Sequence, residues 1–563
     1  MKFLYLLPLL LLFSCKNSPV YSDRSKSILE SHLQEFQAYK NRPDSDGPFN
    51  TKEFLVENIP YLYSEDKNLT KVYNYRWWMI SKHIRPYEDP ADGKKYTVFT
   101  EFFGIKPWAS RSGAIPCPAG HQFHDLRWLK DNTFLKSYIE YFISGSASYL
   151  PQRENANFLT YLSRPEALHY SSWMIHGAEN FLKVHPDASW LNQIYPDLER
   201  HQSLWDSLFL IRSGKTAGLY KIMDLYDGME FSLSAVLALN ASEGPYKPYN
   251  DTTWKGLYLG WGTTSQAAKL PETSQFPKAF RGGYPELYLA RPSINSYMYG
   301  NLLSLSTLSE ILKKRNPYQQ RAYSLQQKIL SELWSEEDQF FHTVTAGDNT
   351  FGIKDYMARV RESVGYTPWY FNLIPKEQAS KYANAWKELD SEDGFAHQFG
   401  MTTAERRHPY YNEEAYAWNG RGWPFQNAMV LKALANHLRH YNGEGKKTFL
   451  KLVKQLVQLH GKQELNIGEW YIPSRGPSFG GEKDYFHSSF PDMVIEDLIG
   501  FQSSHWHEFT LQPFIEGDFY LGNLKYHGHM LQIERVGQTL KVWKNGKAIY
   551  QAKDLGQIHK IKL

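Results

Sequence analysis

Two stretches of the chain place acidic residues beside glycine turns and aromatic side chains. The first reads L-Y-D-G-M-E-F-S-L-S-A and contains Asp227 and Glu230, and the second reads I-G-E-W-Y-I-P-S-R-G and contains Glu469. Two carboxyl groups that face each other can cleave a glycosidic bond, one protonating the leaving oxygen and the other activating water. An acid at a helix start or in a surface loop is also common without any chemical role. The pattern alone therefore leaves both interpretations open.

Further acids occur in comparable settings. Glu482 follows a Gly-Gly turn and is an alternative to Glu469 as the base, and Glu405 lies in T-T-A-E-R-R-H-P. Glu101 lies in the apolar run T-V-F-T-E-F-F-G, where a carboxyl is either paired or functional. A general acid at Glu230 needs burial to raise its pKa. Asp227 is a candidate for tuning it, because a neighbouring anion raises the pKa of an acid.

The stretch Tyr411 to Lys432 supplies side chains that bind sugars. It reads Y-N-E-E-A-Y-A-W-N-G-R-G-W-P-F-Q-N-A-M-V-L-K, a glycine-rich turn that runs into a helix with Pro424 in its first turn. Aromatic faces stack on the C–H faces of sugars, and Arg and Asn bind hydroxyls. A buried aromatic loop that packs two helices is the alternative. The candidate substrate-binding residues of the chain are Asp227, Trp418, Asn419, Arg421, Trp423, Asn427, Trp470, Tyr471, His121 and Glu405.

His121, His124 and Asp125 raise the question of a metal site. No third ligand follows at a fitting spacing, and there is no H-E-x-x-H pattern. We therefore expect no metal, and the segment Pro116 to Asp131 is interpreted as a sugar-binding loop. Cys117 lies between two prolines in I-P-C-P-A-G, which favours a packed thiol over a nucleophile.

The first fifteen residues, M-K-F-L-Y-L-L-P-L-L-L-L-F-S-C, predict an export signal. One basic residue precedes an apolar run that is too short for a permanent membrane span. L-F-S-C resembles a bacterial lipobox, so residues 1–15 are interpreted as a lipoprotein-type signal peptide with Cys15 as the lipidated residue, and residues 16–24 as a tether. An ordinary secretory signal with an incidental Cys15 is the alternative. Either predicts a location outside the cytoplasm, in the periplasm or at the cell surface, and the lipid would anchor the chain to a membrane.

Composition narrows the class of partner. Of 563 residues, 16% are aromatic, which favours an aromatic-lined groove. The 63 basic and 59 acidic residues give a net charge of +4 and are spread along the chain. No basic cluster stands out, so we expect no nucleic-acid partner.

Amphipathic segments of helical period follow one another along most of the chain. They are Ser27–Tyr39, Asn68–Ile84, Asp125–Ile143, Asn155–Leu162, Pro165–Val184, Pro196–Leu210, Glu230–Leu239, Ser293–Lys314, Pro317–Trp334, Lys376–Lys387, Pro424–His440, Lys446–Leu459 and Phe490–Phe501. Many helices in series with loops of uneven length predict a mainly α protein, a toroid of paired helices over residues 25–502. After Ser503 the pattern alternates, with turns at Gly522, Gly537 and Asn545-Gly546, which predicts a small antiparallel β-sandwich-like module over residues 503–563.

Several motifs together resemble the inverting (α/α)6-barrel glycosidases of clan G, which include trehalases, family 63 enzymes and mannosylglycerate-hydrolase-like domains. D-G-M-E-F-S resembles their general-acid motif, with Glu230 at the position of an Asp. E-W-Y-I-P-S-R-G resembles the segment that carries their base, here Glu469. W-N-G-R-G-W-P-F-Q-N resembles a segment before a late barrel helix, with Arg421 in place of the usual Pro. R-P-S-I-N-S-Y-M-Y-G and G-Y-T-P-W-Y-F resemble helix entrances of the mannosylglycerate-hydrolase-like domains.

The resemblance implies an exported glycoside hydrolase that acts on an oligo- or polysaccharide by single displacement with inversion and needs no cofactor. Glu230 is the implied general acid and Glu469 the implied base, with carboxyls about 6.5–9.5 Å apart in this geometry.

Two other functions remain open at this stage. A polysaccharide lyase can use the same toroid, with His121, His124, Arg421 and Tyr416 as candidate residues. A non-catalytic glycan-binding surface lipoprotein would also use aromatic residues, although it has no need of two acids in separate motifs.

Overall fold

The computed structural model describes a few residues between 27 and 34 and then residues 51–104, 106, 110, 112–150, 164–243, 287–350, 352–414, 418–461, 465–476 and 479–563. Cys15, the tether 16–24, the expected helix Asn155–Leu162 and Tyr416 lie outside these residues. In the described part of the chain, no helix has both the length and the hydropathy of a membrane span.

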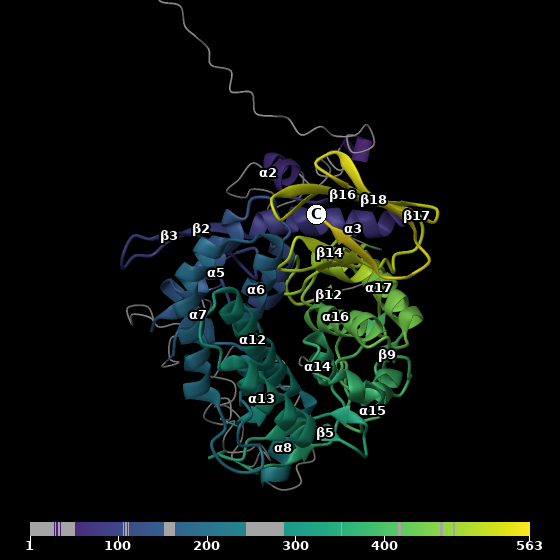
Figure 1. The fold of residues 1–563 in the computed structure, drawn as a ribbon. Coiled ribbons are helices and arrows are strands. Elements are labelled where there is room, and N and C mark those ends of the chain that lie inside the picture. Colours follow the sequence, from purple (N-terminus) through teal and green to yellow (C-terminus); the bar gives the residue numbers. More distant parts are fainter. Residues whose placement is uncertain are drawn as a thin grey trace, which may run out of the picture.

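The helices form a ring, seen along its axis in Figure 1. In the inner layer each helix contacts the next around the ring. These helices are α4 (Ala119–Leu126), α6 (Met174–Val184), α12 (Pro292–Ile311), α14 (Thr367–Tyr370), α16 (Pro424–His440) and the π-helix η7 (Met493–Leu498). The ring closes between η7 and α4, where the Asp125 carboxylate accepts the backbone N–H groups of Phe490 (3.1 Å) and Asp492 (3.0 Å).

A second layer of helices packs outside the first. It consists of α3 (Lys67–His83), α5 (Thr133–Ile143), α7 (Ala188–Phe209), α13 (Tyr318–Glu332), α15 (Ala379–Tyr382) and α17 (Lys446–Gly461). Every residue of α4 and η7 is buried, whereas α13 and α17 bury one stripe and expose the other. This difference is expected of helices inside and outside a toroid. The predicted helical toroid is confirmed.

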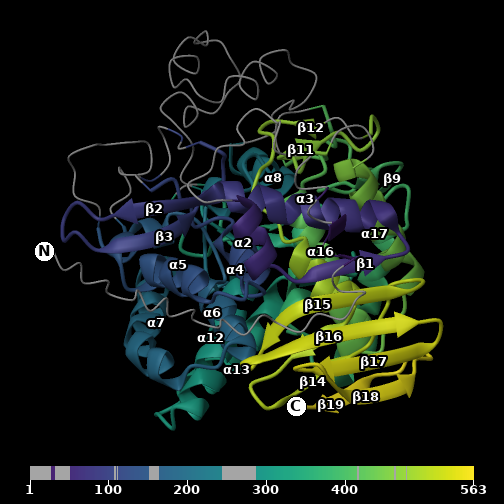
Figure 2. The ribbon, with the colours of Figure 1, turned by 90° about the horizontal axis from the view of Figure 1, so that it is seen from above.

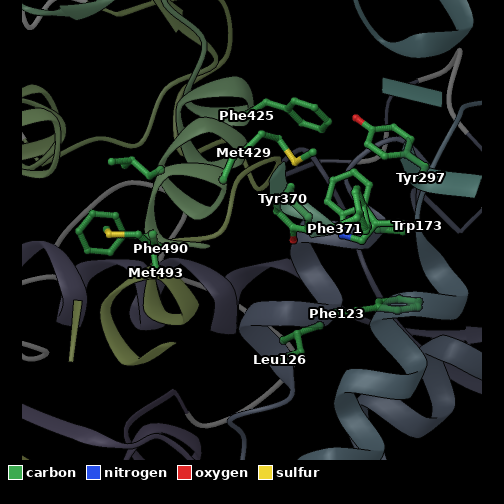
Figure 3. Close-up of a cluster of buried hydrophobic side chains, with 14 of the residues drawn as sticks. Phe123, Leu126, Trp173, Tyr297, Tyr370, Phe371, Phe425, Met429, Phe490 and Met493 are labelled. Carbon is green, nitrogen blue, oxygen red and sulfur yellow. The ribbon is translucent and has the colours of Figure 1, made fainter. Parts of the chain in front are cut away.

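Aromatic side chains fill the interior of the ring (Figure 3). Trp173 packs against Tyr297 at 4.7 Å and Tyr370 at 5.7 Å between ring centroids. It also lies 6.2 Å from Phe425, the second residue of α16. These contacts join α6, α12, α14 and α16, so the helices that carry the candidate site are held by one core.

The C-terminal region is an antiparallel β structure, as predicted. One sheet has the order β1-β15-β16-β17-β18 and a smaller one the order β13-β14-β19. The strands are β13 (Phe501–Ser503), β14 (Glu508–Leu511), β15 (Phe519–Tyr526), β16 (His529–Val536), β17 (Thr539–Lys544), β18 (Lys547–Lys553) and β19 (His559–Lys562). Strand β1 (Tyr61–Ser64) comes from the start of the chain and pairs Tyr61 with Gly522. The C-terminal sheet is therefore completed by an N-terminal strand that alternation after Ser503 could not reveal.

Short elements gather at one end of the ring. In Figure 2, β11 (Trp470–Tyr471), β12 (Phe479–Gly480) and α8 (Leu233–Glu243) lie at the same end. The other minor elements are α2 (Thr51–Asn58), β2 (Ile84–Glu88), β3 (Lys95–Phe99), β4 (Leu289–Ala290), β5 (Trp334–Ser335), β6 (Phe340–Phe341), β7 (Thr343–Thr345), β8 (Met357–Ala358), β9 (Ala396–His397) and β10 (Gly400–Met401), with the 3-10 helices η1 (Ser146–Ser148), η2 (Glu166–Leu168), η3 (Asp224–Asp227), η4 (Ser363–Tyr366), η5 (Lys376–Gln378) and η6 (Ala383–Leu389).

Several predicted helix boundaries are wrong. Helix α6 begins at Met174 rather than Pro165, and α7 begins at Ala188 rather than Pro196. The expected helix Asp125–Ile143 is divided between α4 and α5, and the expected helix Lys376–Lys387 is the series η5, α15 and η6.

The expected helix Phe490–Phe501 is shorter, because η7 ends at Leu498 and Phe501 already pairs with Leu511 in β13. The expected helix start at Glu230 is also displaced, since α8 begins at Leu233. Phe231 has φ 54° and Gly228 has φ 70°, so the backbone turns twice around Glu230 before the helix can begin.

Candidate active site

Glu230 lies on a turn that a buried ion pair holds in place. The Arg291 guanidinium donates from Nε to Asp227 Oδ2 at 2.8 Å and from Nη1 to Ser232 Oγ at 2.7 Å. Arg291 therefore binds the turn on both sides of Glu230. The side chains of Arg291 and Asp227 are fully buried, and Ser293 donates to the same carboxylate oxygen. Asp227 is thus occupied as the partner of Arg291.

Glu469 lies on a loop that is closed by reciprocal hydrogen bonds with Glu482. The Glu469 N–H donates to Glu482 O, and the Glu482 N–H donates to Glu469 Oε2, each at 2.9 Å. A Cβ on Gly481, which has φ +72°, would lie 1.9 Å from that carboxylate oxygen. The Gly-Gly turn is therefore needed for the backbone to approach the acid. The Glu482 carboxylate instead forms an ion pair with Lys106 at 2.7 Å and is 44% exposed.

The stretch around Trp418 connects these two loops. The Trp418 N–H donates to Glu230 O at 3.3 Å, and Gly422 exchanges two backbone hydrogen bonds of 2.9 Å with Tyr471. The rings of Trp418 and Trp423 stack at 4.4 Å, inclined by 11°. The Arg421 guanidinium lies 3.6 Å from the centre of the Trp470 ring, a cation–π contact. The tertiary structure thus brings Glu230 and Glu469 into one site from segments far apart in sequence.

Both acids bind protons more tightly than ordinary glutamates. Burial, together with the charges of Asp224 and Glu469, raises the pKa of Glu230 to about 8, while hydrogen bonds from its own backbone N–H and from Trp418 oppose the rise. Burial also raises the pKa of Glu469, to about 7. There the Glu482 N–H and the charges of Arg421 and Lys106 favour the anion, while the Glu482 carboxylate disfavours it. Two cations thus act on Glu469, whereas the charges that act on Glu230 are those of two carboxylates.

Glu101 is a third acid of this site. Its backbone oxygen accepts the Phe486 N–H at 2.9 Å, which ties it to the segment whose His487 contacts Glu469 O at 3.0 Å. Burial raises the pKa of Glu101 to about 8; the Tyr485 hydroxyl opposes the rise, and the charges of Glu469 and Glu230 increase it. The sequence marked Glu101 as either paired or functional, but no local pattern connected it with the other two acids.

A cluster of aromatic and apolar side chains includes Phe102, which follows Glu101 in the chain, and Tyr485, whose hydroxyl bonds the Glu101 carboxyl. Its buried members, Phe102, Ile115, Tyr170 and Tyr485, come from separate segments of the chain. Cys117 and Tyr226 pack against them. Burial and the charges of Glu101 and Glu230 raise the pKa of the Cys117 thiol, which keeps it protonated. That is the state expected of a packed thiol rather than a nucleophile.

The remaining sequence candidates contact other protein groups. Asn419 donates to Tyr410 O at 2.7 Å, and Asn427 donates to the Tyr471 hydroxyl at 2.6 Å. Glu405 forms an ion pair with Arg361 at 2.8 Å. His121 is fully buried between Trp173 and Phe425, and burial holds its pKa well below the usual value. These side chains hold the elements around the acids together.

One further group of side chains has metal-ligating chemistry. The ligand atoms of His124, Asp492 and Glu496 lie within 4.8 Å of one another, and all three residues are buried. However, Arg127 donates to both carboxylates, and Lys432 lies 2.8 Å from Glu496. Two cations already occupy these oxygens, so the donor set does not fit a divalent ion. Asp125, the third residue of the metal hypothesis, is taken by backbone N–H groups of residues 490 and 492.

Comparison with known proteins places the chain in a family. The model of the mannosylglycerate hydrolase MGH1-like glycoside hydrolase domain matches residues 111–488. The structure resembles a solved sialidase over 95% of this chain, with 26% identity and a TM-score of 0.74. It also resembles the GH63 mannosylglycerate hydrolase from Thermus thermophilus, with 14% identity and a TM-score of 0.51 over 75% of this chain and 99% of that one. The latter likeness concerns the fold.

An uncharacterised protein of Borreliella burgdorferi is 27% identical over 225 residues, which is 37% of this chain. The chain spans 44% of that protein and 44% of the solved sialidase. It thus covers less than half the length of these two relatives.

Proposed function

The chain belongs to the mannosylglycerate hydrolase MGH1-like glycoside hydrolase family, and from that premise we propose that it cleaves a glycosidic bond, α-linked in its natural substrate, by single displacement with inversion. Glu230 protonates the leaving oxygen. Glu469 removes a proton from a water on the opposite face of the sugar. The observation that carries this assignment is the pair of carboxyls with unequal environments in one site.

The environment of Glu230 suits a general acid. Such a group must hold its proton at the pH of the reaction, and a pKa of about 8 does so near neutrality. The negative charges of Asp224 and Glu469 act in the same direction as burial. Arg291 holds the turn on both sides of the acid, which fixes the position from which the proton is delivered.

The environment of Glu469 suits the base. The base must be ionised when the acid is protonated, and here the Glu482 N–H, Arg421 and Lys106 all favour its anion. Glu482 is the weaker candidate, since its carboxylate is paired with Lys106 and nearly half exposed. Environments that separate two carboxyl pKa values in this way are typical of acid–base pairs.

Aromatic residues between the two loops provide surfaces for a sugar. Trp418, Trp423 and Trp470 lie on the turn and loop that join the acids, with Arg421 stacked on Trp470. We propose that these rings pack against the substrate and that Arg421 binds a hydroxyl. The sialidase likeness does not identify the sugar, because this chain spans less than half of that protein.

We further propose that the enzyme is exported and anchored to a membrane through a lipid on Cys15. The apolar leader that ends at this cysteine supports the proposal. Mass spectrometry of the N-terminus of the protein isolated from its native cells tests it. A mature N-terminus at another residue, without lipid, would contradict it.

The decisive experiment is a screen of the purified protein against a panel of oligosaccharides and polysaccharides, with product anomers followed by proton NMR. We expect hydrolysis with the anomeric configuration opposite to that of the substrate, and no hydrolysis by Glu230→Gln. A retained configuration would contradict the mechanism but not the hydrolase. An unsaturated product that absorbs in the ultraviolet would identify a lyase, and binding without any product would favour a glycan-binding protein.

A further inference from the structure

Glu101 differs from most of the buried acids that the structure describes. Most of these carboxylates are in contact with a cation. The pairs are Asp125 with Arg76, Asp227 with Arg291, Asp492 with Arg127, Asp497 with Lys432, Glu179 with Lys183 and Glu405 with Arg361. Glu101 is 5% exposed, and among the described residues it has no cation within ion-pair distance. An uncompensated carboxyl in such surroundings is costly to fold.

The position of Glu101 in the fold indicates a functional role for this buried carboxyl. Its backbone oxygen is bonded to Phe486 N, next to the residue that contacts the Glu469 loop. Tyr170 and Tyr485 pack beside it, and Glu230 and Glu469 are near enough for their charges to act on it. Costly buried groups concentrate at functional sites, and this one lies beside both candidate catalytic acids.

A buried hydrogen-bond donor in the same site also lacks a partner. Trp423 is 6% exposed, and its indole Nε1 has no hydrogen-bond acceptor among the described residues. The ring lies between the loops, stacked on Trp418 and 6.4 Å from the His487 ring. A polar ligand such as a sugar, whose hydroxyls both donate and accept, could accept a hydrogen bond from this indole and add to the one that Tyr485 makes with Glu101.

We propose that Glu101 is a third carboxyl of the substrate site, and that it selects a sugar ring that is uncharged or carries an ammonium group over a ring that carries a carboxylate. The proposal rests on the proposed function, because it assumes that this site receives the sugar. Glu101 and Glu230 have no cation in ion-pair contact among the described residues, and burial raises the pKa of each to about 8. A carboxylate on the ring would keep both acids protonated and leave its own buried charge without a cation, whereas an ammonium group would favour the ionised form of Glu101. The available cations, Arg421 and Lys106, lie on the Glu469 side.

Calorimetry with a matched pair of small probes tests the proposal without any need for catalysis. Tris is an ammonium triol, and 1,1,1-tris(hydroxymethyl)ethane has the same shape without the charge. In a non-amine buffer at pH 7.5, we expect the full-length protein to bind Tris about tenfold or more tightly than the uncharged triol. Glu101→Gln should weaken Tris binding about tenfold and change triol binding less than about twofold. Glu101→Asp, which keeps a carboxyl group, should restore most of the preference.

A control variant separates selection from packing. Tyr485→Phe removes the hydroxyl beside Glu101 and keeps its carboxyl, so the preference for Tris should persist. The proposal is overturned if the wild type shows no preference for Tris, or if Glu101→Gln keeps that preference with an unchanged thermal midpoint. A Tris preference that depends on Glu101 in a protein that hydrolyses no glycan would instead refute the hydrolase proposal alone.

If the screen of glycans identifies a substrate, the corresponding uronide, whose ring carries a carboxylate, provides a second measure of the selectivity. We expect kcat/KM for the uronide to be at least a hundredfold lower in the wild type. Glu101→Gln should lower the ratio of kcat/KM for the uncharged substrate to kcat/KM for the uronide. An unchanged ratio would overturn the assignment of Glu101 as a selector.

Discussion

Two groups of buried acids in this chain have opposite properties. Asp492, inside the ring, is bound by Arg127 at 2.5 Å and by the Trp128 indole at 2.7 Å, and Arg127 holds its pKa far below the usual value against the effect of burial. Glu230, at the end of the ring where α8 and β11 lie, has no cation in ion-pair contact among the described residues, and its pKa rises to about 8. At Asp492 the charge of the cation outweighs burial, whereas at Glu230 no cation in contact opposes it. Burial raises the pKa of Asp227 even beside Arg291, so a cation partner does not always outweigh burial.

The comparison predicts that Glu230 and Glu469, which have no cation in ion-pair contact among the described residues, are required for turnover. Glu230→Gln and Glu469→Gln should each lower turnover by about 10²–10⁴-fold, because each removes one proton transfer, while binding of substrate changes far less. Substrates with good leaving groups should partly rescue Glu230→Gln, since they need no proton, but not Glu469→Gln. Steady-state kinetics on both kinds of substrate measure the effect.

Azide gives an independent check on the base. Glu469→Ala leaves room for a small anion in place of the water, so added azide should partly restore turnover. If Glu482→Gln, and not Glu469→Gln, abolishes turnover, the base has been assigned to the wrong residue of its loop.

The buried acids that form an ion pair should contribute to the free energy of unfolding rather than to turnover. Asp492→Asn removes one of the two carboxylates that contact Arg127 and should lower the free energy of unfolding by about 3–5 kcal/mol, with turnover per folded molecule retained. Chemical denaturation measures the change. The control is Asp390→Asn, whose carboxylate pairs with Lys451 at 3.4 Å at the surface and should contribute about 1 kcal/mol or less. Equal effects of the two substitutions would remove the distinction between buried and exposed pairs.

The pH dependence of kcat/KM sharpens the comparison. Activity requires ionised Glu469 and protonated Glu230. It should fall as pH drops below about 7, when Glu469 becomes protonated, and fall again as pH rises above about 8, when Glu230 loses its proton. Glu230→Gln should lack the alkaline limb in its residual activity. An optimum near pH 5 would show that the acids are far less perturbed than their burial implies.

The smallest expected effect is on the stability of the Glu230 variant. The pKa of Glu230 is higher in the folded state than the ordinary value of 4.5, so its stabilising contribution is present below about pH 4.5 and is lost as pH rises towards 8. Glu230→Gln cannot ionise and should melt at a higher temperature than the wild type at pH 8, with little difference at pH 4.5. Thermal melts at the two pH values measure it, and a lower melting temperature at pH 8 would contradict it.

Local patterns predicted the regular elements well. The predicted helix Pro424–His440 is α16 with the same ends, because its period and Pro424 at the first turn are local signals. The predicted Asn545-Gly546 turn joins β17 to β18, and both residues have positive φ, 49° and 81°. The helix expected to begin at Glu230 was displaced because Arg291, about sixty residues away, holds the turn before it.

Charge pairing within the site was not predictable in the same way. Asp227 was expected to tune Glu230, but Arg291, Ser293 and Ser171 hold its carboxylate, and Asp224 is the aspartate whose charge raises the pKa of Glu230. Glu101 was marked only as an acid in an apolar run. Its proximity to Glu230 and Glu469 depends on contacts across more than a hundred residues of sequence.

The sequence by itself determined the helices, the C-terminal strands, the glycine turn beside Glu469 and the motifs that resemble a glycosidase family. These depend on residue type and on spacing over a few residues, which the chain carries locally. Only the tertiary structure decided which buried acids have a cation partner, that β1 completes the C-terminal sheet, and that Glu101 lies beside Glu230 and Glu469. The physical reason is that pKa values and strand pairing depend on neighbours in space, and closing the ring of helices makes distant segments neighbours.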